Sequence, residues 1–299
     1  MELSKRLFMT ASMVERGSIV ADVGCDHGYT AIYLVQNGIC PRVLAMDVNE
    51  GPLAAAREHI REAGLTAYIE TRLSDGLSAM RWTEAAAPIG AGTCRRPEAD
   101  TLLMAGIGGR LAARILQNGA DKLACMQTVI VQPQSELWLV RRMLQDLGYR
   151  ITAEDMVKED GKFYTAIRAQ RAACFYTCGE GEAEALKASA PPEAPAMPEG
   201  LSLTREEWQE AGERWGHPLI EGRHPVFLEC LKEVFWKKGA AREALRAGAI
   251  RAGAEENGSP EELSEELPER SRERLAQLEK EAFLAGRLVG WLEKGKTKW

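Results

Sequence analysis

The segment SIVADVGCDHGYTAIYLV, residues 18–35, constrains the fold of this chain more than any other feature. A short apolar run contains Asp22, is interrupted by Gly24 and Gly28, and resumes as an apolar stretch of helical character. This pattern is typical of a parallel β-strand that turns tightly into a helix, because glycines let the backbone approach a ligand. We therefore expect a strand–turn–helix unit beneath an adenine-containing cofactor.

A second unit of this kind follows at residues 41–60, and its apolar run carries the acid Asp47. An acid at the tip of the second strand is placed to hold ribose hydroxyls. Asp26 stands where a middle glycine would be expected in the first turn, and its charge would repel a pyrophosphate. The turn therefore favours S-adenosylmethionine, which is cationic and has no phosphate, over NAD. A glycine turn that binds no ligand is the third alternative.

Strand-like and helical patterns alternate between residues 18 and 150. The apolar strand candidates lie at 18–24, 42–48, 66–73, 100–106 and 128–134. This alternation predicts βαβ units and a parallel sheet with helices on both faces. Two further strand-like runs, 149–161 and 162–171, meet at a turn and predict a terminal hairpin, as in class I methyltransferases. We expect an α/β, Rossmann-like sheet of seven mostly parallel strands.

Two segments interrupt this pattern and are interpreted as insertions. Residues 83–98 are rich in Ala, Gly and Pro, and residues 179–200 contain four prolines and few apolar side chains. The predicted domains are 1–170, a linker at 171–200, and a helical domain at 201–299.

The helical domain is predicted from two long amphipathic patterns at 224–248 and 272–294. Two such helices about one connection predict an antiparallel hairpin of coiled-coil type. Its packing seam is expected at Leu275, Leu278, Phe283 and Leu288.

Composition and targeting signals favour a cytoplasmic protein. No apolar run approaches the roughly 20 residues that span a bilayer. The first 17 residues predict a helix and lack the apolar core of a signal peptide. Seven cysteines, an odd number, fit reduced thiols. Cys174 and Cys178 have no neighbouring ligand pair, so no metal is expected.

The formal net charge of −6 is unevenly distributed along the chain. Residues 223–251 contain seven Lys or Arg against three Glu, whereas residues 255–269 contain seven Glu and no basic residue. The basic run is interpreted either as an RNA-facing surface or as a solvated helix face, and the acidic run as a solvated segment.

Six short motifs stand in a characteristic order along the chain: LSKRL, DVGCDHGY, LSDGL, MAGIGG, VQPQ and EDGKFY. As an ordered set over residues 3–168, they resemble the bacterial tRNA (adenine-22-N1)-methyltransferase family. The resemblance implies a class I methyltransferase domain followed by a helical, coiled-coil-like domain. It also implies S-adenosylmethionine as cofactor and tRNA as substrate. No membrane is expected as a partner, and the protein is expected to be a monomer or weak dimer.

The resemblance also implies a set of cofactor-binding residues. Asp22 and Gly24 would line the methionine end, and the acid after the second strand would take the ribose hydroxyls. Glycines after the fourth strand, where this fold contacts the target base, permit close approach of a flat ring. The implied cofactor-binding residues are Asp22, Gly24, Asp47, Val48, Asp75, Gly76, Gly106 and Ile107.

The catalytic candidates are Asp26, His27, Tyr29 and Gln134. A carboxylate or imidazole near N1 of adenine would stabilise the cationic product or accept a proton, and Tyr29 would stack on the flipped base. Gln134 replaces the Asn that the family pattern carries but keeps a carboxamide. Methylation of another RNA site or a small molecule, and cofactor binding without catalysis, are the alternatives.

Overall fold

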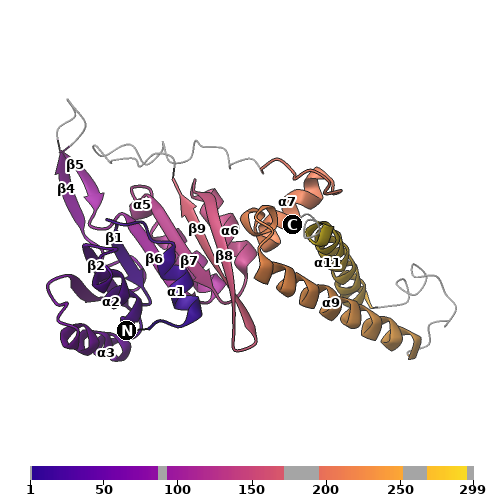
Figure 1. The fold of residues 1–299 in the computed structure, drawn as a ribbon, viewed down its shortest axis with the longest axis horizontal. Helices are drawn as coiled ribbons and strands as arrows, with labels where there is room; N and C mark the ends of the chain where they lie inside the picture. Colours follow the sequence, from indigo (N-terminus) through magenta and orange to yellow (C-terminus); the bar gives the residue numbers. More distant parts are fainter. Residues whose placement is uncertain (1, 87–92, 172–194, 252–267, 295–299) are drawn as a thin grey trace. The chain divides into compact units, whose positions relative to one another are not determined.

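The computed structural model describes residues 2–86, 93–171, 195–251 and 268–294 (Figure 1). Cys174, Cys178, most of the predicted linker and most of the acidic run lie outside these described residues. The chain divides into two compact units. The first comprises residues 1–193 and 213–218, and the second comprises 194–212 and 219–299. The three-part domain division made from the sequence stays a prediction.

The first unit is built on a seven-stranded sheet with the order β3-β2-β1-β6-β7-β9-β8 (Figure 1). Five strands run parallel, and β9 is antiparallel to both β7 and β8. The strands are β1 Ile19–Val23, β2 Arg42–Asp47, β3 Ile69–Leu73, β6 Thr101–Ile107, β7 Thr128–Pro133, β8 Arg150–Glu159 and β9 Lys162–Gln170. This order confirms the predicted Rossmann-like methyltransferase sheet and its terminal hairpin.

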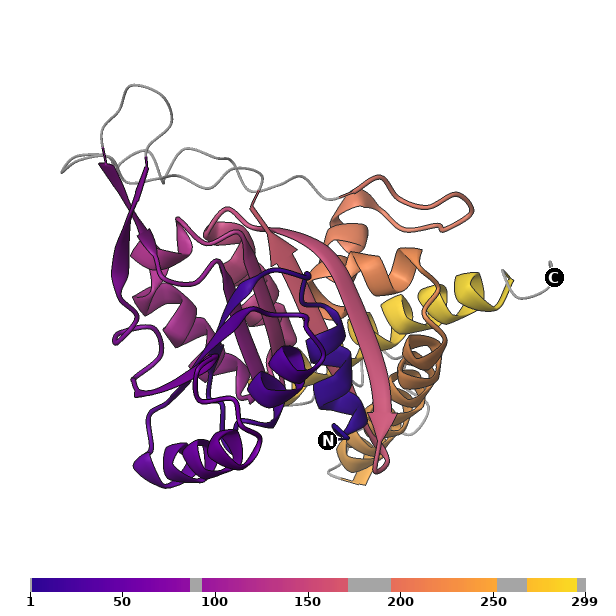
Figure 2. The same cartoon turned by 60° about the vertical axis from the view of Figure 1, so that its left-hand side comes forward.

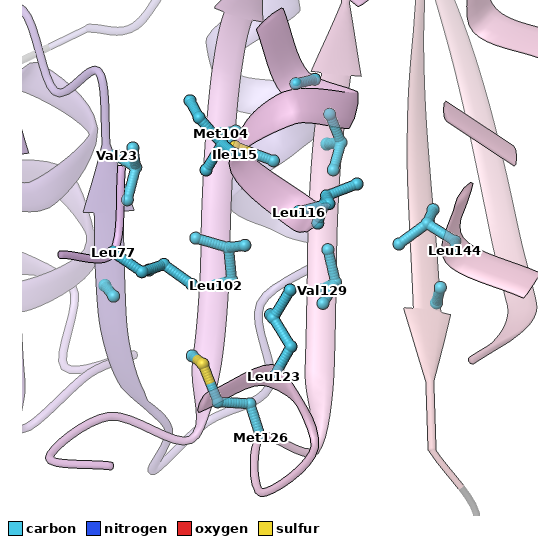
Figure 3. Packing of buried hydrophobic residues seen from close by; sticks show 14 of the residues in the cluster. Val23, Leu77, Leu102, Met104, Ile115, Leu116, Leu123, Met126, Val129 and Leu144 are labelled. Carbon is cyan, nitrogen blue, oxygen red and sulfur yellow. The ribbon is translucent and has the colours of Figure 1, made fainter. Parts of the chain in front are cut away.

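Helices cover both faces of this sheet, as the apolar strands require. One face carries α1 Lys5–Ser12, α2 Tyr29–Gln36 and α3 Glu50–Glu62. The other carries α4 Gly109–Asn118, α5 Ala120–Leu123 and α6 Leu137–Asp146. Side chains alternate between the two cores, since Leu102 and Met104 pack with Leu116 of α4 whereas Leu103 joins the opposite cluster (Figure 3). Both faces are therefore buried, which explains the near-continuous apolar strands.

The first predicted insertion contains an element that composition did not reveal. Its flanks form a two-stranded antiparallel ribbon of β4 Trp82–Ala86 and β5 Thr93–Pro97 (Figure 2). Residues 87–92 lie outside the described residues. The Ala- and Gly-rich composition of this stretch hid the strands, because their pairing is decided by register and not by a strong apolar pattern.

The C-terminal part of the chain contains α7 Arg205–Trp215, α8 His217–Glu221, α9 Pro225–Arg251 and α11 Glu269–Lys294. Ion pairs join Lys232 to Glu293 and Lys238 to Glu281, so α9 and α11 run antiparallel. This confirms the predicted helical hairpin. In the described parts of the chain, no helix combines the length and apolar character needed to cross a membrane.

The predicted packing seam of α11 is wrong at one position. Leu275, Leu278 and Leu288 are buried, but Phe283 is 51% exposed. The helical period explains the difference, because Ala282 and Ala285 continue the stripe set by Leu275 and Leu278 and turn Phe283 outward. Gly286 lies where α11 meets α9, because a Cβ there would lie 3.1 Å from the ring of Phe235.

Substitutions at Leu288 and Phe283 test which side chains of α11 are buried against the rest of the helical unit. Leu288→Ala should lower the free energy of unfolding by about 2–5 kcal/mol, because a fully buried leucine leaves a cavity. Phe283→Ala should lower it by less than about 1 kcal/mol, because its ring is half exposed. Urea unfolding followed by far-ultraviolet circular dichroism measures both. A larger loss for Phe283→Ala would contradict the assignment.

Candidate functional site

The candidate site lies at the carboxyl ends of the parallel strands, where the strand order changes direction between β1 and β6. The turn after β1 is fastened to β2, because the N–H groups of Gly24 and Cys25 donate to the Met46 carbonyl at 2.8 and 3.0 Å. Gly28 then precedes α2, and a Cβ there would lie 3.2 Å from that of Ala56 in α3. The predicted strand–turn–helix unit is therefore present, with a turn pressed close to its neighbours.

Asp22 is a buried acid beneath this turn. Its side chain is 2% exposed, and its Oδ2 atom has no hydrogen-bond partner among the described residues. Burial, assisted by the nearby charge of Asp47, raises the pKa of Asp22 to about 7. A Cβ built on Gly24 would meet no atom within 4 Å. A buried oxygen without a partner, beside an open backbone, suits a ligand that donates a hydrogen bond or carries a positive charge.

Asp47 ends β2 and organises the next part of the site. Its Oδ2 accepts the N–H of Asp26 at 3.3 Å, and its Oδ1 accepts the N–H of Asn49 at 2.9 Å. The Asp47 carbonyl accepts the N–H of Ser74 at 2.8 Å. One residue thus ties together the turns after β1, β2 and β3, with its carboxylate 8% exposed.

Three further cofactor candidates follow β2 and β3. Val48 is 59% exposed although it is apolar, and Asp75 is also exposed. Gly76 is buried, with φ +55°, and its carbonyl accepts the hydroxyl of Ser74 at 2.8 Å. An exposed apolar side chain beside exposed and buried polar groups is a suitable wall for a heterocyclic ring.

Gly106 forms a bulge that shapes the far side of the site. The register between β6 and β7 shifts here, and Gly106 adopts φ +74°, a conformation that glycine tolerates. Its N–H donates to Oε1 of the buried Gln132 at 3.0 Å, and Ile107 accepts the N–H of Gln134 at 2.8 Å. Gln132 therefore holds the bulge, while Gln134 continues past the strand end.

The structure brings three of the four catalytic candidates together. Asp26, at φ +50°, has a side chain that is 71% exposed, and its Oδ1 lies 3.5 Å from Nε2 of His27. The rings of His27 and Tyr29 stack with centroids 5.6 Å apart. Gln134 lies apart from these three, beyond β7 and next to Gly106: a Cβ on Gly106 would lie 3.6 Å from its Nε2.

Two further residues at this edge were missed by the sequence interpretation. His59 of α3 stacks on Tyr29 with centroids 5.1 Å apart, and its Nδ1 lies 3.0 Å from the His27 carbonyl. No motif contains His59, so no local signal identifies it. Arg6 lies close to Gly106, since a Cβ on that glycine would approach its Nη1 to 3.0 Å. Arg6 belongs to LSKRL, a motif noted in the sequence without an assigned role.

The charge of the site suits a cation. Asp22, Asp26 and Asp47 converge on the turn after β1, and this concentration of carboxylates disfavours a pyrophosphate. Within the described ranges, no cluster of three His, Cys, Asp or Glu side chains is arranged to hold a metal ion. The residues present therefore fit a cationic, phosphate-free cofactor.

Comparison with known proteins identifies a family model and a curated relative. A family model described as a methyltransferase domain matches residues 3–167, more than half of the chain. The tRNA (adenine(22)-N(1))-methyltransferase of Bacillus subtilis is 32% identical over 170 residues, which cover 57% of this chain and 66% of that protein, just under two thirds.

Two crystal structures resemble almost the whole chain. The B. subtilis m1A22 tRNA methyltransferase TrmK matches with a TM-score of 0.67 and 26% identity, over 96% of this chain and 99% of that one. A Streptococcus pneumoniae protein, Sp1610, in complex with S-adenosyl-L-methionine matches with a TM-score of 0.65 and 26% identity, over 96% and 100%.

The raised pKa of Asp22 makes stability depend on pH. Its folded-state pKa of about 7 exceeds the ordinary value of 3.8. Between these two pH values, the carboxyl group is protonated in the folded protein and ionised in the unfolded chain. This stabilisation is present at low pH and is lost as pH rises towards 7. Asp22→Asn should therefore add little to the free energy of unfolding at pH ~4.5 and a few kcal/mol at pH ~8.

Urea unfolding without cofactor measures this difference, and Asp121→Asn, an exposed acid on α5, is the matched control. An equal effect of Asp22→Asn at both pH values would show that the carboxyl group is not buried as described.

Proposed function

This chain belongs to the methyltransferase family whose domain model it matches over residues 3–167, and we propose that it methylates N1 of an adenine in tRNA. The proposed donor is S-adenosylmethionine, and the proposed target is position 22. The observation that carries the proposal is the buried, unpartnered Oδ2 of Asp22 beneath a turn rich in carboxylates. The tRNA target is supported by the names of the B. subtilis relative and its structure.

The residues of β1 and β2 are proposed to bind the donor. When bound, S-adenosylmethionine would supply an electrophilic methyl group on a sulfonium. Asp22 would accept a hydrogen bond from the ammonium group on the methionine part of the donor, because its Oδ2 atom otherwise has no hydrogen-bond partner among the described residues. Asp47 would accept the ribose hydroxyls with the lone pairs that its two amide contacts leave available.

The adenosine end is proposed to lie along the turns after β2 and β3. Val48 offers an exposed apolar surface to a ring, and Asp75 offers a carboxylate to an exocyclic amine. Gly76 brings backbone close to the ring edge, and a side chain there is excluded because Ile115 lies 3.0 Å from the Cβ position. Gly106 and Ile107 are proposed to complete the donor site opposite these turns.

Asp26 is proposed to act on the target base. The N1 atom of adenine has a lone pair at neutral pH, so the reaction needs alignment and stabilisation of a positive product. The exposed carboxylate of Asp26 can provide that charge, with His27 3.5 Å away to orient it or to accept a proton from the N6 amine. Because N1 lies on the pairing edge, the base must leave its stack, and Tyr29 and Gln134 are proposed to hold it.

A large RNA substrate agrees with the second unit. Lys237 of α9 is 75% exposed in its side chain, although it also pairs with Glu233. The long helices thus offer cationic groups that a small-molecule enzyme does not need. The cytoplasmic location and the monomeric or weakly dimeric state remain parts of this proposal.

Mass spectrometry of nucleosides tests the activity directly. Incubation with unmodified tRNA and labelled donor should yield 1-methyladenosine, and tRNA with A22 replaced by G should yield none.

Asp26→Ala should lower the rate of single-turnover methyl transfer by about 10²-fold or more, with donor affinity within a few-fold of the parent. If Asp26→Ala transfers methyl at the parental rate, the Asp26 carboxylate has no catalytic role and is only a residue of the turn. Asp121→Asn serves as control.

Donor binding is tested separately by calorimetry. Asp47→Ala should weaken the affinity for S-adenosylmethionine by about 1–3 kcal/mol, because buried polar partners lose a charged acceptor. The same substitution also loosens the turn that carries Asp26, so Asp47→Asn, which keeps one oxygen acceptor, should lose less. Unchanged affinity in both variants would remove Asp47 from the site.

A further inference from the structure

Two sequence motifs without an assigned role, at residues 3–7 and 159–164, meet in the first unit. Glu159, the last residue of β8, accepts the N–H of Lys5 through Oε1 at 2.7 Å. Its Oε2 lies 3.9 Å from Nε of Arg6. One carboxylate therefore contacts both the first turn of α1 and the side chain of Arg6. Helix α1 packs beside β8 in the first unit (Figure 2).

A second support for Arg6 comes from β9. The guanidinium carbon lies 5.8 Å from the ring centroid of Tyr164, a cation–π arrangement. The register pairs Val131 of β7 with Ile167 of β9, and extending it by three residues sets Tyr164 level with Gln134. The β8–β9 hairpin thus carries Arg6 past the end of β7, to the edge that holds the candidate site.

Arg6 lies on the β6–β7 side of that site. Its Nη1 lies 3.0 Å from the position that a Cβ would occupy on Gly106. The guanidinium makes no hydrogen bond to another residue in the described part of the chain, and the side chain is 33% exposed. It therefore has donors in a fixed orientation that are available to a ligand.

The distribution of charge indicates which ligand group Arg6 meets. Asp22, Asp26 and Asp47 make the β1 side of the site anionic, whereas Arg6, paired with Glu159, places a guanidinium on the β6–β7 side. A methylated adenine is positive and is disfavoured against a guanidinium, but a phosphate pairs with one in a bidentate manner. A nucleotide spans both sides if its base lies towards Asp26 and its phosphate towards Arg6.

We infer that Arg6, positioned by Glu159 and Tyr164, binds a backbone phosphate of the nucleotide whose base is methylated. This inference rests on the proposed function, since it takes an RNA as the substrate. Arg6 would then be a substrate-binding residue, and Glu159 and Tyr164 would be positioning residues that act through it.

The salt dependence of tRNA binding tests the phosphate contact. For Arg6→Gln, the slope of log K against log salt should fall in magnitude by about 0.7–0.9, the value for one phosphate. The KM for tRNA should rise about tenfold, and S-adenosylmethionine affinity should stay within twofold. Arg6→Lys should keep the slope but lose part of the affinity for tRNA. Lysine retains the positive charge but lacks the paired N–H donors with which a guanidinium binds a phosphate. Arg16→Gln, at the opposite end of β1, is the matched control.

Positioning by Glu159 is tested with a double-mutant cycle. Glu159→Gln should raise the KM for tRNA in the parent and have no further effect in the Arg6→Gln background, because both changes remove one contact. An unchanged slope in Arg6→Gln, additive losses in the cycle, or a weakened affinity for the donor would each overturn the inference. If the parent protein forms no 1-methyladenosine in tRNA, the proposed function fails instead.

Discussion

The parallel pairing of β1 with β2 on one side and β6 on the other is the constraint on which the first unit depends. Right-handed crossovers from a central strand place successive helices on opposite faces when the chain changes direction. The loops that follow β1 and β6 therefore lead to opposite faces of the sheet, and sheets of this kind bind ligands at that point. Every site residue predicted from the sequence lies within a few residues of a strand end, so the loops supply the chemistry of the site while the sheet supplies its geometry.

The burial of Asp22 makes an unfavourable electrostatic contribution to folding, and a bound cation would reduce it. Asp22 is buried without a partner for Oδ2, and its raised pKa records the penalty of an ionised carboxylate there. Asp47 reduces its own penalty by accepting two backbone N–H groups, but its charge adds to that of Asp22. A protein without a ligand to bind would gain stability from a neutral residue at position 22. This unfavourable arrangement is therefore an argument for binding and not for folding.

The guanidinium of Arg6 and the carboxylates that follow β1 and β2 lie at different parts of this edge. Arg6 lies beyond β6 and β7, and Asp26 lies beyond β1. A uniform negative site would attract the cationic donor but repel the phosphates of an RNA. On the proposed function, the separation of these charges would let this edge bind both the cationic donor and an RNA. Gly106 is central to this, because its bulge and missing side chain make room for the guanidinium.

The sequence by itself determined the strand–turn–helix units, the series of strands, the terminal hairpin and the acids at the strand tips. These features can be predicted because they depend on the order of apolar residues, glycines and turn residues over short stretches of the chain. The same patterns selected Asp22, Asp47 and Asp26, because a strand end is recognisable without knowing its partners. Roles for these residues remain proposals, although the structure gathers Asp26, His27 and Tyr29 at one edge.

Only the tertiary structure decided the contacts between distant segments. The approach of Arg6 to Glu159 and Tyr164 joins residues more than 150 positions apart, and no local pattern encodes that distance. The outward turn of Phe283 depended on which side of α11 meets α9, and a seam chosen from leucines and phenylalanine alone placed it inward. The β4–β5 ribbon likewise follows from register between two weak strands. Pairing and packing are cooperative properties of the folded chain, and for that reason they become visible only there.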